Sequence, residues 1–354
     1  MPNLPDPRCF AAEESNPLRD LAVRIVAEPD AMQRERFRAE LKADLLQTLR
    51  AGRDDLLSDA VTEVSSPETG RCLWDALDDA VNTPGDGAAG LAASLFAIPV
   101  VFVAAGPVGR EVPGMVRDVR RLARVLEDNG AIGVHQNFGL NQALCAETSV
   151  EAFSPSRLYG LLRRVEAERV DIWPDLIPAP IELVSNEERV DLRFVTGILV
   201  AGVNAPSLSS TAADVGRWGM PFAKELIAQL STRGVTLLPI PRPPHRLLKS
   251  LHQGHAAREE VALQTFVSRV VRQLRAGVGE PEVTLTAVRP DVILVQVGSP
   301  MDADQTFSHR WHLHPLDRLS DVVNSILELL RECRVEHVDM IDELVDPQAP
   351  KPKS

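Results

Sequence analysis

Cysteine is scarce and widely spaced in this chain. The four cysteines among its 354 residues, Cys9, Cys72, Cys145 and Cys333, form no Cys-x-x-Cys pair. This spacing argues against a disulfide framework. The N-terminal residues also lack a basic segment followed by an apolar run, so we expect no secretory signal and predict a cytoplasmic location.

Positive charge is in short supply as well. Lys and Arg total 38 against 50 Asp and Glu, which gives a formal net charge of −12. Because affinity for a polyanion comes mainly from a positive surface, this balance argues against a dedicated nucleic-acid binder. We interpret the Arg117, Arg120, Arg121 and Arg124 block as the solvated face of a helix. Arg greatly outnumbers Lys, a bias that we read as high-GC coding in a bacterial gene.

Long apolar runs are almost absent, and the one exception lies between Gly87 and Gly109, where no residue carries a formal charge. Its length approaches that of a membrane-spanning helix. Pro99 interrupts the run, however, and β-branched residues follow it. We therefore predict a short buried helix followed by a buried strand, and we do not expect residues 91–108 to contact a membrane.

Catalytic signatures are missing too. The glycines at 106, 109 and 114 fit neither the dinucleotide-binding fingerprint nor the P-loop. A helix N-terminus can still attract an anion, so Arg110 remains a candidate ligand-binding residue. His135, Asn137 and Asn141 form a second candidate site, because we expect them just beyond the carboxyl end of a strand, where α/β proteins bind ligands.

What the sequence does contain is hydrophobic periodicity, and this periodicity predicts an α/β protein with mixed sheets. Its 44% apolar content is enough for sizeable cores. We expect a helical N-terminal region over residues 1–85, a first α/β region over 86–244, a second over 245–346 and a disordered tail over 347–354.

Several elements are expected at defined positions within these regions. The apolar positions of residues 263–274 follow the 3, 4 rhythm of a surface helix. Turn residues predict two hairpins, one from 181–184 into Val190 and one from 283–287 into 292–297. The remaining expectations are strands at 98–104, 131–134, 190–203, 235–240, 306–313 and 335–341, and helices opening at Pro113, Pro221 and Pro315.

Two tryptophan motifs resemble each other. Residues 217–221 read Arg-Trp-Gly-Met-Pro, and residues 310–315 read Arg-Trp-His-Leu-His-Pro. We take this echo to predict duplicated strand-helix-strand units in which Trp218 and Trp311 pack under the first turn of a helix. Alternatively, the two rings are exposed at a partner interface, together with the proline-rich segment that contains Pro241 and Pro243.

Histidine is distributed unevenly, since seven of the eight lie between residues 245 and 337. On a strand, His312 and His314 would point to one face, and His255 is a candidate third ligand for zinc or iron. No metalloenzyme signature surrounds them, and we expect Gly254 to break the helix that would align His252 with His255.

Repetition without a recognisable catalytic group indicates a non-catalytic bacterial assembly or regulatory protein that contacts an unidentified protein partner, without a cofactor. The alternative is a metal-assisted hydrolase centred on His312 and His314.

Overall fold

The computed structural model describes residues 16–64, 66–85, 91–132, 137–168, 176–202, 212–277, 281–289, 291–299, 302–335 and 337–340. The N-terminal region consists of helices α1 (Pro17–Ala27), α2 (Ala31–Ala51), α3 (Asp54–Thr62) and α4 (Pro67–Val81). Asn16, Asp30 and Ser66 cap α1, α2 and α4, and each accepts a hydrogen bond from a first-turn amide. The predicted helical character of this region is confirmed.

The first sheet is built around a long central strand. Strands β1 (Leu91–Ala105), β3 (Asn137–Ala146), β5 (Arg189–Gly202) and β6 (Thr236–Pro241) lie in the order β3-β5-β1-β6, and all neighbours are antiparallel. The uncharged run is therefore strand from Leu91 onwards, and the short helix expected before residue 98 is wrong. Among the described residues, no helix is long and apolar enough to cross a membrane.

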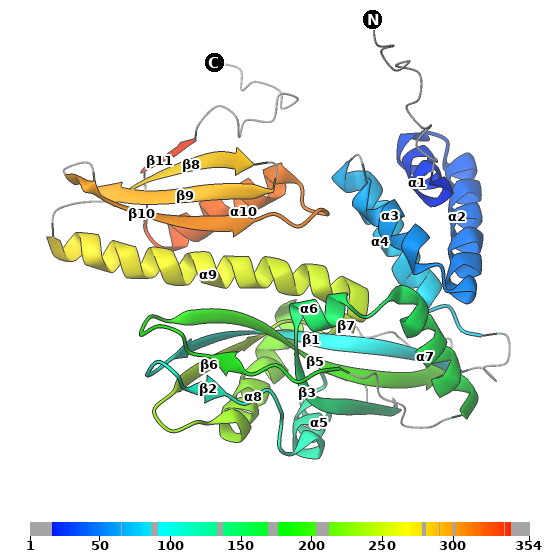
Figure 1. Ribbon diagram of the computed structural model, residues 1–354, viewed down its shortest axis with the longest axis horizontal. Helices are drawn as coiled ribbons and strands as arrows, with labels where there is room; N and C mark the ends of the chain where they lie inside the picture. Colours follow the sequence, from blue (N-terminus) through cyan, green and yellow to red (C-terminus); the bar gives the residue numbers. More distant parts are fainter. Residues whose placement is uncertain are drawn as a thin grey trace, which may run out of the picture.

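Two strand-helix-strand units interleave in this sheet. Helix α5 (Val119–Asp128) connects β1 to β3, helix α8 (Ala212–Leu230) connects β5 to β6, and both helices pack on the same face (Figure 1). The order is that of a split β-α-β arrangement. Trp218 lies inside α8 and is fully buried, with its ring edge-on to Phe222 at 5.6 Å. Pro221 is also inside α8, so the expected helix start at this proline is wrong.

The second sheet has a different topology. Strands β8 (Glu282–Arg289), β9 (Val292–Ser299) and β10 (Asp302–His312) form an antiparallel meander, and β11 (His337–Met340) pairs with β8 in parallel. The predicted hairpin of β8 and β9 is confirmed. Trp311 lies near the end of β10 and packs in the core with helix α10 (Leu319–Glu332). Because Trp218 is helical and Trp311 is in a strand, the two motifs are not equivalent, and regions 190–240 and 283–341 do not match strand for strand.

Shorter elements account for other differences from expectation. Strand β4 (Ile181–Glu182) pairs with β2 (Glu111–Val112), so the hairpin predicted between 181–184 and β5 is wrong. Helices α6 (Glu147–Glu151) and α7 (Pro155–Glu168) follow β3, and β7 (His245–Arg246) pairs with β1. Helices α5 and α10 each begin several residues after the prolines expected to open them. For α5 the cap is Asp118, whose side chain accepts from the Arg121 amide.

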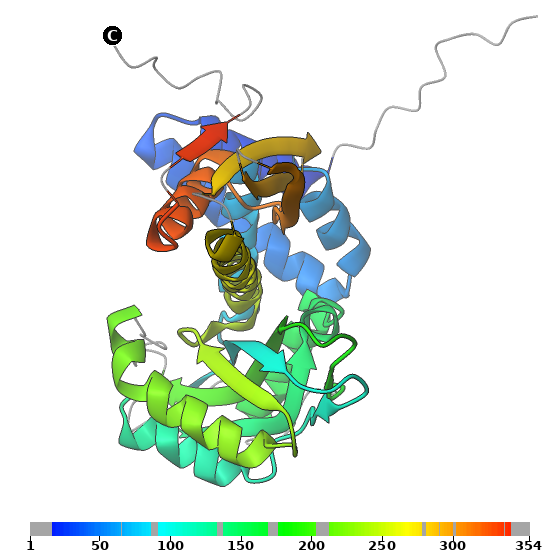
Figure 2. The same ribbon diagram turned by 90° about the vertical axis from the view of Figure 1, so that its left-hand side faces the viewer.

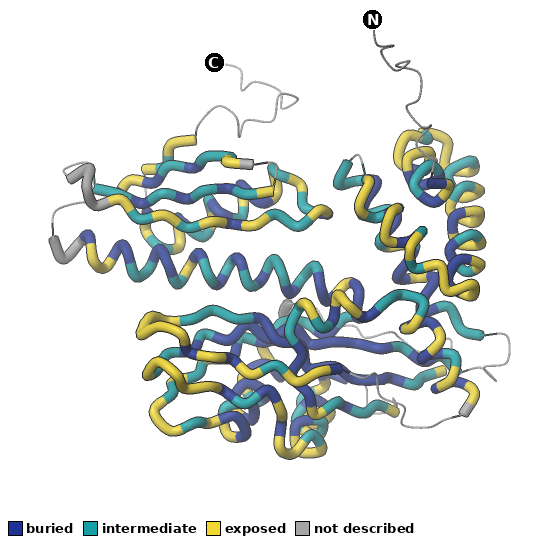
Figure 3. Tube along the Cα trace, viewed as in Figure 1, coloured by how far each residue is buried: buried dark blue, intermediate teal, exposed yellow. Residues whose placement is uncertain are grey.

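Helix α9 (Leu247–Gly277) runs between the two sheets and contacts both (Figure 2). Its first half contributes buried side chains to the core shared by the first sheet and the N-terminal helices. Its second half, from Leu263 to Leu274, contributes to the core of the second sheet. Buried positions accordingly recur along its length (Figure 3). The sequence predicted its C-terminal half but not its continuation towards the N-terminus.

The break that we expected at Gly254 does not occur, because α9 continues through this residue. A Cβ atom at Gly254 would lie 2.9 Å from Cζ of Phe194 on β5, closer than real carbon contacts. The glycine therefore lets the helix approach the sheet closely. By continuing through it, α9 keeps His252 and His255 one turn apart.

We expect Gly254→Ala to lower the free energy of unfolding by about 1 to 3 kcal/mol, because the added methyl group overpacks against Phe194. Gly160→Ala is the matched control in α7, where an added Cβ meets nothing within 4 Å. It should raise the free energy of unfolding by up to about 1 kcal/mol through helix propensity alone. Urea unfolding followed by circular dichroism measures both, and equal effects would contradict the close approach.

Candidate functional site

The connection between β10 and α10, residues 313–318, lies where the N-terminal helices, α9 and the second sheet meet. On α4, Arg71 Nε donates to the carbonyl oxygen of Leu316 at 2.7 Å. The Leu316 side chain is 3% exposed and approaches α4 at Gly70, where a Cβ would be 3.0 Å from its Cδ2. Arg318 donates to Glu68 at 2.7 Å. This connection is thus anchored to the N-terminal region.

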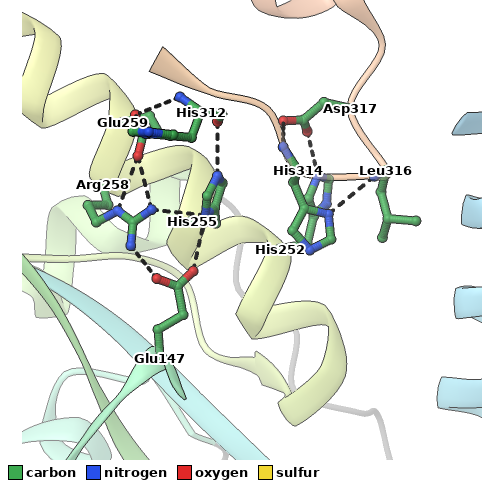
Figure 4. A network of polar contacts seen from close by, with 9 residues as sticks. All are labelled: Glu147, His252, His255, Arg258, Glu259, His312, His314, Leu316 and Asp317. Atoms are coloured by element: carbon green, nitrogen blue, oxygen red, sulfur yellow. Dashed lines mark hydrogen bonds and ion pairs between the residues drawn. The ribbon is translucent and has the colours of Figure 1, made fainter. Parts of the chain in front are cut away.

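Helix α9 places two imidazoles against the same connection. His252 and His255 lie one turn apart and both rings face His314, with centroid separations of 4.9 and 5.6 Å. His252 Nε2 lies 2.8 Å from Asp317 Oδ1, and Asp317 Oδ2 accepts from the His314 amide at 2.9 Å (Figure 4). We call these residues, with Glu147, Arg258, Glu259 and His312, the histidine junction.

His255 reaches two different regions through its two ring nitrogens. Its Nε2 lies 3.0 Å from the carbonyl oxygen of His312, which can only accept, so Nε2 carries a proton. Its Nδ1 lies 3.1 Å from Glu147 on α6 and also 3.1 Å from Arg258 Nη2. Burial lowers the pKa of His255, but the Glu147 and His312 hydrogen bonds outweigh it and hold this pKa above its usual value. The charged form donates through both nitrogens.

The carboxylates of the junction are fully occupied. Arg258 bonds Glu147, and it donates to Glu259 Oε1 at 3.0 Å. Glu259 is 4% exposed, and its other oxygen accepts from the His312 amide at 3.2 Å. Buried carboxylates are costly unless they are paired, and here each has a cationic or N–H partner.

His314 differs from its neighbours in its protonation. Burial, together with the like charges of the nearby His252 and His255, lowers its pKa to about 4. Its Nδ1 accepts from the Leu316 amide at 3.2 Å, which requires an unprotonated nitrogen. His314 is therefore neutral at physiological pH.

The expected metal set is not brought together as the sequence indicated. Strand β10 ends at His312, so alternation does not continue to His314, which turns towards α9 while the His312 side chain remains 56% exposed. His255 does meet His314, but His255 is bonded to Glu147 and to a backbone carbonyl. Among the described residues, no group of three or more His, Cys, Asp or Glu side chains is arranged to hold a metal ion.

The candidate ligand-binding residues are also separated. Asn137 and Asn141 lie within β3 and not beyond a strand end, and Asn141 Oδ1 accepts from the Ala143 amide at 2.9 Å. Asn137 pairs with Val200 of β5, which in turn pairs with Ala93 near the beginning of β1, whereas Arg110 follows the end of β1. They therefore lie at opposite ends of the sheet. His135 is outside the described residues.

The candidate interface residues are mostly inaccessible. Trp218 is 0% and Trp311 is 3% exposed, so neither ring can contact a partner of the folded protein. Pro241 is buried in β6, and Pro243 lies on a shallow surface beside Arg242 and His245. Both tryptophans are core residues as expected, but neither packs under the first turn of a helix as a repeated motif, because Trp218 lies inside α8 and Trp311 lies in β10.

Sequence reasoning missed Glu147, Arg258 and Asp317 as members of the junction. Glu147 lies 108 residues from His255 along the chain, and no local pattern signals the contact. Asp317 carried a weak signal, because an Asp shortly after a chain reversal often accepts a backbone amide.

A second polar cluster joins the N-terminal helices to the first sheet. Arg246 Nη1 on β7 lies 3.3 Å from Asp78 and 3.0 Å from Asp79, both on α4. Burial raises the pKa of Asp78 to about 6, and the attraction of Arg246 only partly opposes this. Of its two carboxylate oxygens, Oδ1 is buried without a hydrogen-bond partner.

Compared with protein-family models, curated proteins and solved structures, the chain matches none of them.

We expect His314→Asn to remove part of the acid sensitivity of the fold. The folded pKa of His314 is about 4 against 6.5 for an ordinary histidine, so its contribution is present above pH 6.5 and is lost as the pH falls towards 4. The free energy of unfolding of the native protein should fall between about pH 7.5 and about pH 5 by about 1 to 2 kcal/mol more than that of the variant.

Urea unfolding at the two pH values measures this difference. Asparagine keeps an acceptor for the Leu316 amide but cannot become charged. His337→Asn, at an exposed position of β11, is the matched control and should retain the native pH dependence. Identical losses in the native protein and in His314→Asn would show that His314 is not held neutral.

Asp78→Asn should stabilise the protein at neutral pH. Because the folded pKa of Asp78 is raised, the folded chain retains a proton that the unfolded chain loses, and stability falls as the pH rises from 3.8 to about 6. We expect a gain of about 1 to 3 kcal/mol above about pH 7 and little change near pH 4. Thermal unfolding measures this gain in the free energy of unfolding. The control is Asp79→Asn at the exposed neighbouring position, which should change the free energy of unfolding by less than about 0.5 kcal/mol.

Proposed function

We propose that this protein is a non-catalytic assembly or regulatory protein that acts through contacts with a protein partner. One observation carries the proposal: the ionisable side chains of the histidine junction bond to one another or to backbone groups, and so join α6, α9 and the connection between β10 and α10. A structural role for these groups explains why so many of them converge without a catalytic motif.

The hydrogen-bond partners of the junction support this reading over catalysis. A general base must reach a substrate proton with a free ring nitrogen. His255 has partners at both nitrogens, His314 uses Nδ1 for the Leu316 amide, and His252 is paired with Asp317. Most of the basic capacity of the junction is therefore committed internally.

The rival function, a metal-assisted hydrolase centred on His312 and His314, has one supporting observation, which is the closeness of two other imidazoles, His252 and His255, to His314. Zinc or iron would need three or four ligands directed at one point. The nearby carboxylates of Glu147, Glu259 and Asp317 are engaged by Arg258 and by backbone amides. We therefore favour the non-catalytic function, and with it a cytoplasmic location without nucleic-acid binding.

Metal analysis separates the two functions. We expect protein purified without an affinity tag to contain zinc and iron far below one equivalent by inductively coupled plasma mass spectrometry. We expect His312→Ala and His314→Ala to leave that content unchanged. One equivalent of metal in the native protein, lost in both variants, would overturn the proposed function in favour of the hydrolase.

Crosslinking in the cells of origin tests the partner directly. The full chain, expressed from its own locus, should co-purify with a defined protein at a reproducible ratio after brief formaldehyde treatment. A chain that is recovered alone, and that hydrolyses a generic ester in a His312-dependent manner, would contradict the proposal.

A further inference from the structure

A single ring nitrogen of His255 has two partners that require opposite protonation states. Its Nδ1 lies 3.1 Å from Glu147 Oε1 on α6 and 3.1 Å from Arg258 Nη2, within one turn on α9 (Figure 4). An ionised carboxylate can only accept a hydrogen bond, whereas a guanidinium can only donate one. Nδ1 therefore bonds Glu147 when it carries a proton and Arg258 when it does not.

The other ring nitrogen of His255 is held in one state. Nε2 lies 3.0 Å from the carbonyl oxygen of His312 at the end of β10, so it keeps its proton in both forms of the ring. The partner of one nitrogen selects the tautomer of a neutral histidine. When charged His255 titrates, the proton is accordingly lost to solvent from Nδ1. Titration exchanges the partner of Nδ1 and leaves the bond to β10 intact.

Both possible partners of Nδ1 are held in place independently of His255. Arg258 Nη1 bonds Glu147 Oε2, and Arg258 Nη2 also donates to Glu259 Oε1 at 3.0 Å. The side chains of His255 and Glu147 are only 12% and 15% exposed, so water has little access to their contact. The exchange therefore takes place between two fixed groups.

Other charged and titratable side chains surround His255 in the junction. They are His252, Arg258 and Glu259 on α9, Glu147 and Glu151 on α6, and His312, His314 and Asp317 on β10 and the connection that follows it. His314 stays neutral near pH 7, because burial and like charges lower its pKa to about 4. Burial raises the pKa of Glu147, but His255 and Arg258 lower it overall, so Glu147 stays charged. The proton on Nδ1 itself therefore decides between the two bonds.

We propose that Nδ1 of His255 is a proton-operated switch between α6 and the second sheet. With its proton, His255 bonds Glu147 and the His312 carbonyl oxygen at once, and so ties α6, which follows β3 of the first sheet, to the end of β10. Without it, Nδ1 bonds Arg258 on its own helix, and the direct tie from His255 to α6 is released. This inference goes beyond the proposed function, because it concerns the coupling of the two sheets whether or not a partner is bound.

The direction of the pH dependence follows from the environment of His255. Burial lowers its pKa, but the hydrogen bonds to Glu147 and to His312 outweigh burial and hold the pKa above the usual 6.5. A group of this kind contributes stability that is complete below its unfolded pKa and is lost as the pH rises through its folded pKa. The tie to α6 is therefore formed in mildly acidic solution and released in alkaline solution.

NMR of the full chain with isotope-labelled histidine tests the switch at the atom concerned. Proton–nitrogen correlation spectra separate the charged imidazole from each neutral tautomer, and comparison with His255→Gln identifies the His255 signals. We expect both nitrogens to be protonated at about pH 6 and only Nε2 to be protonated at about pH 9. A neutral form with its proton on Nδ1, or no titration over this range, would overturn the proposal.

Two variants of α6 show whether the Glu147 bond controls the titration. Glu147→Gln removes the charged acceptor with little change in shape and should lower the pKa of His255. Glu151→Gln is the matched control, because it removes the same charge one turn away from a side chain that interacts with His255 through charge alone. It should move the titration much less. Equal displacement in both variants would show that the Nδ1 bond is not the cause, and the proposal would fail.

Hydrogen exchange measured by mass spectrometry reports the release of α6. The amides of Ala152 and Phe153 bond to the carbonyl oxygens of Thr148 and Val150 in this helix. After correction for the intrinsic pH dependence, we expect them to exchange about fivefold faster at about pH 8.5 than at about pH 6, because the bond to Arg258 only partly replaces the lost bond to Glu147. In Glu147→Gln the corrected rates at the two pH values should be nearly equal. Unchanged protection in the native protein, once NMR shows that His255 has lost its proton, would contradict the release.

Discussion

The close approach of Gly254 to the Phe194 ring is the constraint on which the arrangement of the molecule depends. Helix α9 can lie against the first sheet only because no Cβ intervenes at that position. The same helix then extends into the second sheet, where its other half completes a separate core. Since a helix of 31 residues is stiff, a contact near one end sets the place of everything attached to the other.

The histidine junction lies where α9 changes from one sheet to the other. Apolar packing alone leaves the rotation of two cores about a shared helix weakly defined, whereas directional hydrogen bonds define it well. We interpret the paired carboxylates, Arg258 and the three imidazoles as groups that specify one arrangement, with little net gain in stability after the cost of burying them. The hydrogen bond from Arg71 of α4 to the Leu316 carbonyl oxygen fixes the N-terminal helices in the same arrangement.

Hydrophobic periodicity predicted the elements whose neighbours lie close by in sequence. The 3, 4 rhythm of residues 263–274 and the β8–β9 hairpin depend on local spacing and on turn residues, and both appear as expected. The helix start predicted at Pro221 and the helix break predicted at Gly254 were wrong, because the tertiary surroundings tolerate both residues inside helices. The junction was only partly predictable: histidine enrichment indicated the region, but Glu147 reaches it through the fold and no local sequence pattern signals the contact.

The late position of α9 in the chain bears on how the protein is made. During synthesis the ribosome completes β1, β3, β5 and β6 before it reaches Leu247. The sheet face that α9 covers in the folded protein is therefore uncovered by α9 until then. Domains generally acquire their structure as they emerge, and an uncovered apolar layer is a common cause of misassembly. Nascent chains of this protein thus pass through a stage in which chaperones have an obvious surface to bind, and that stage ends only when α9 has emerged.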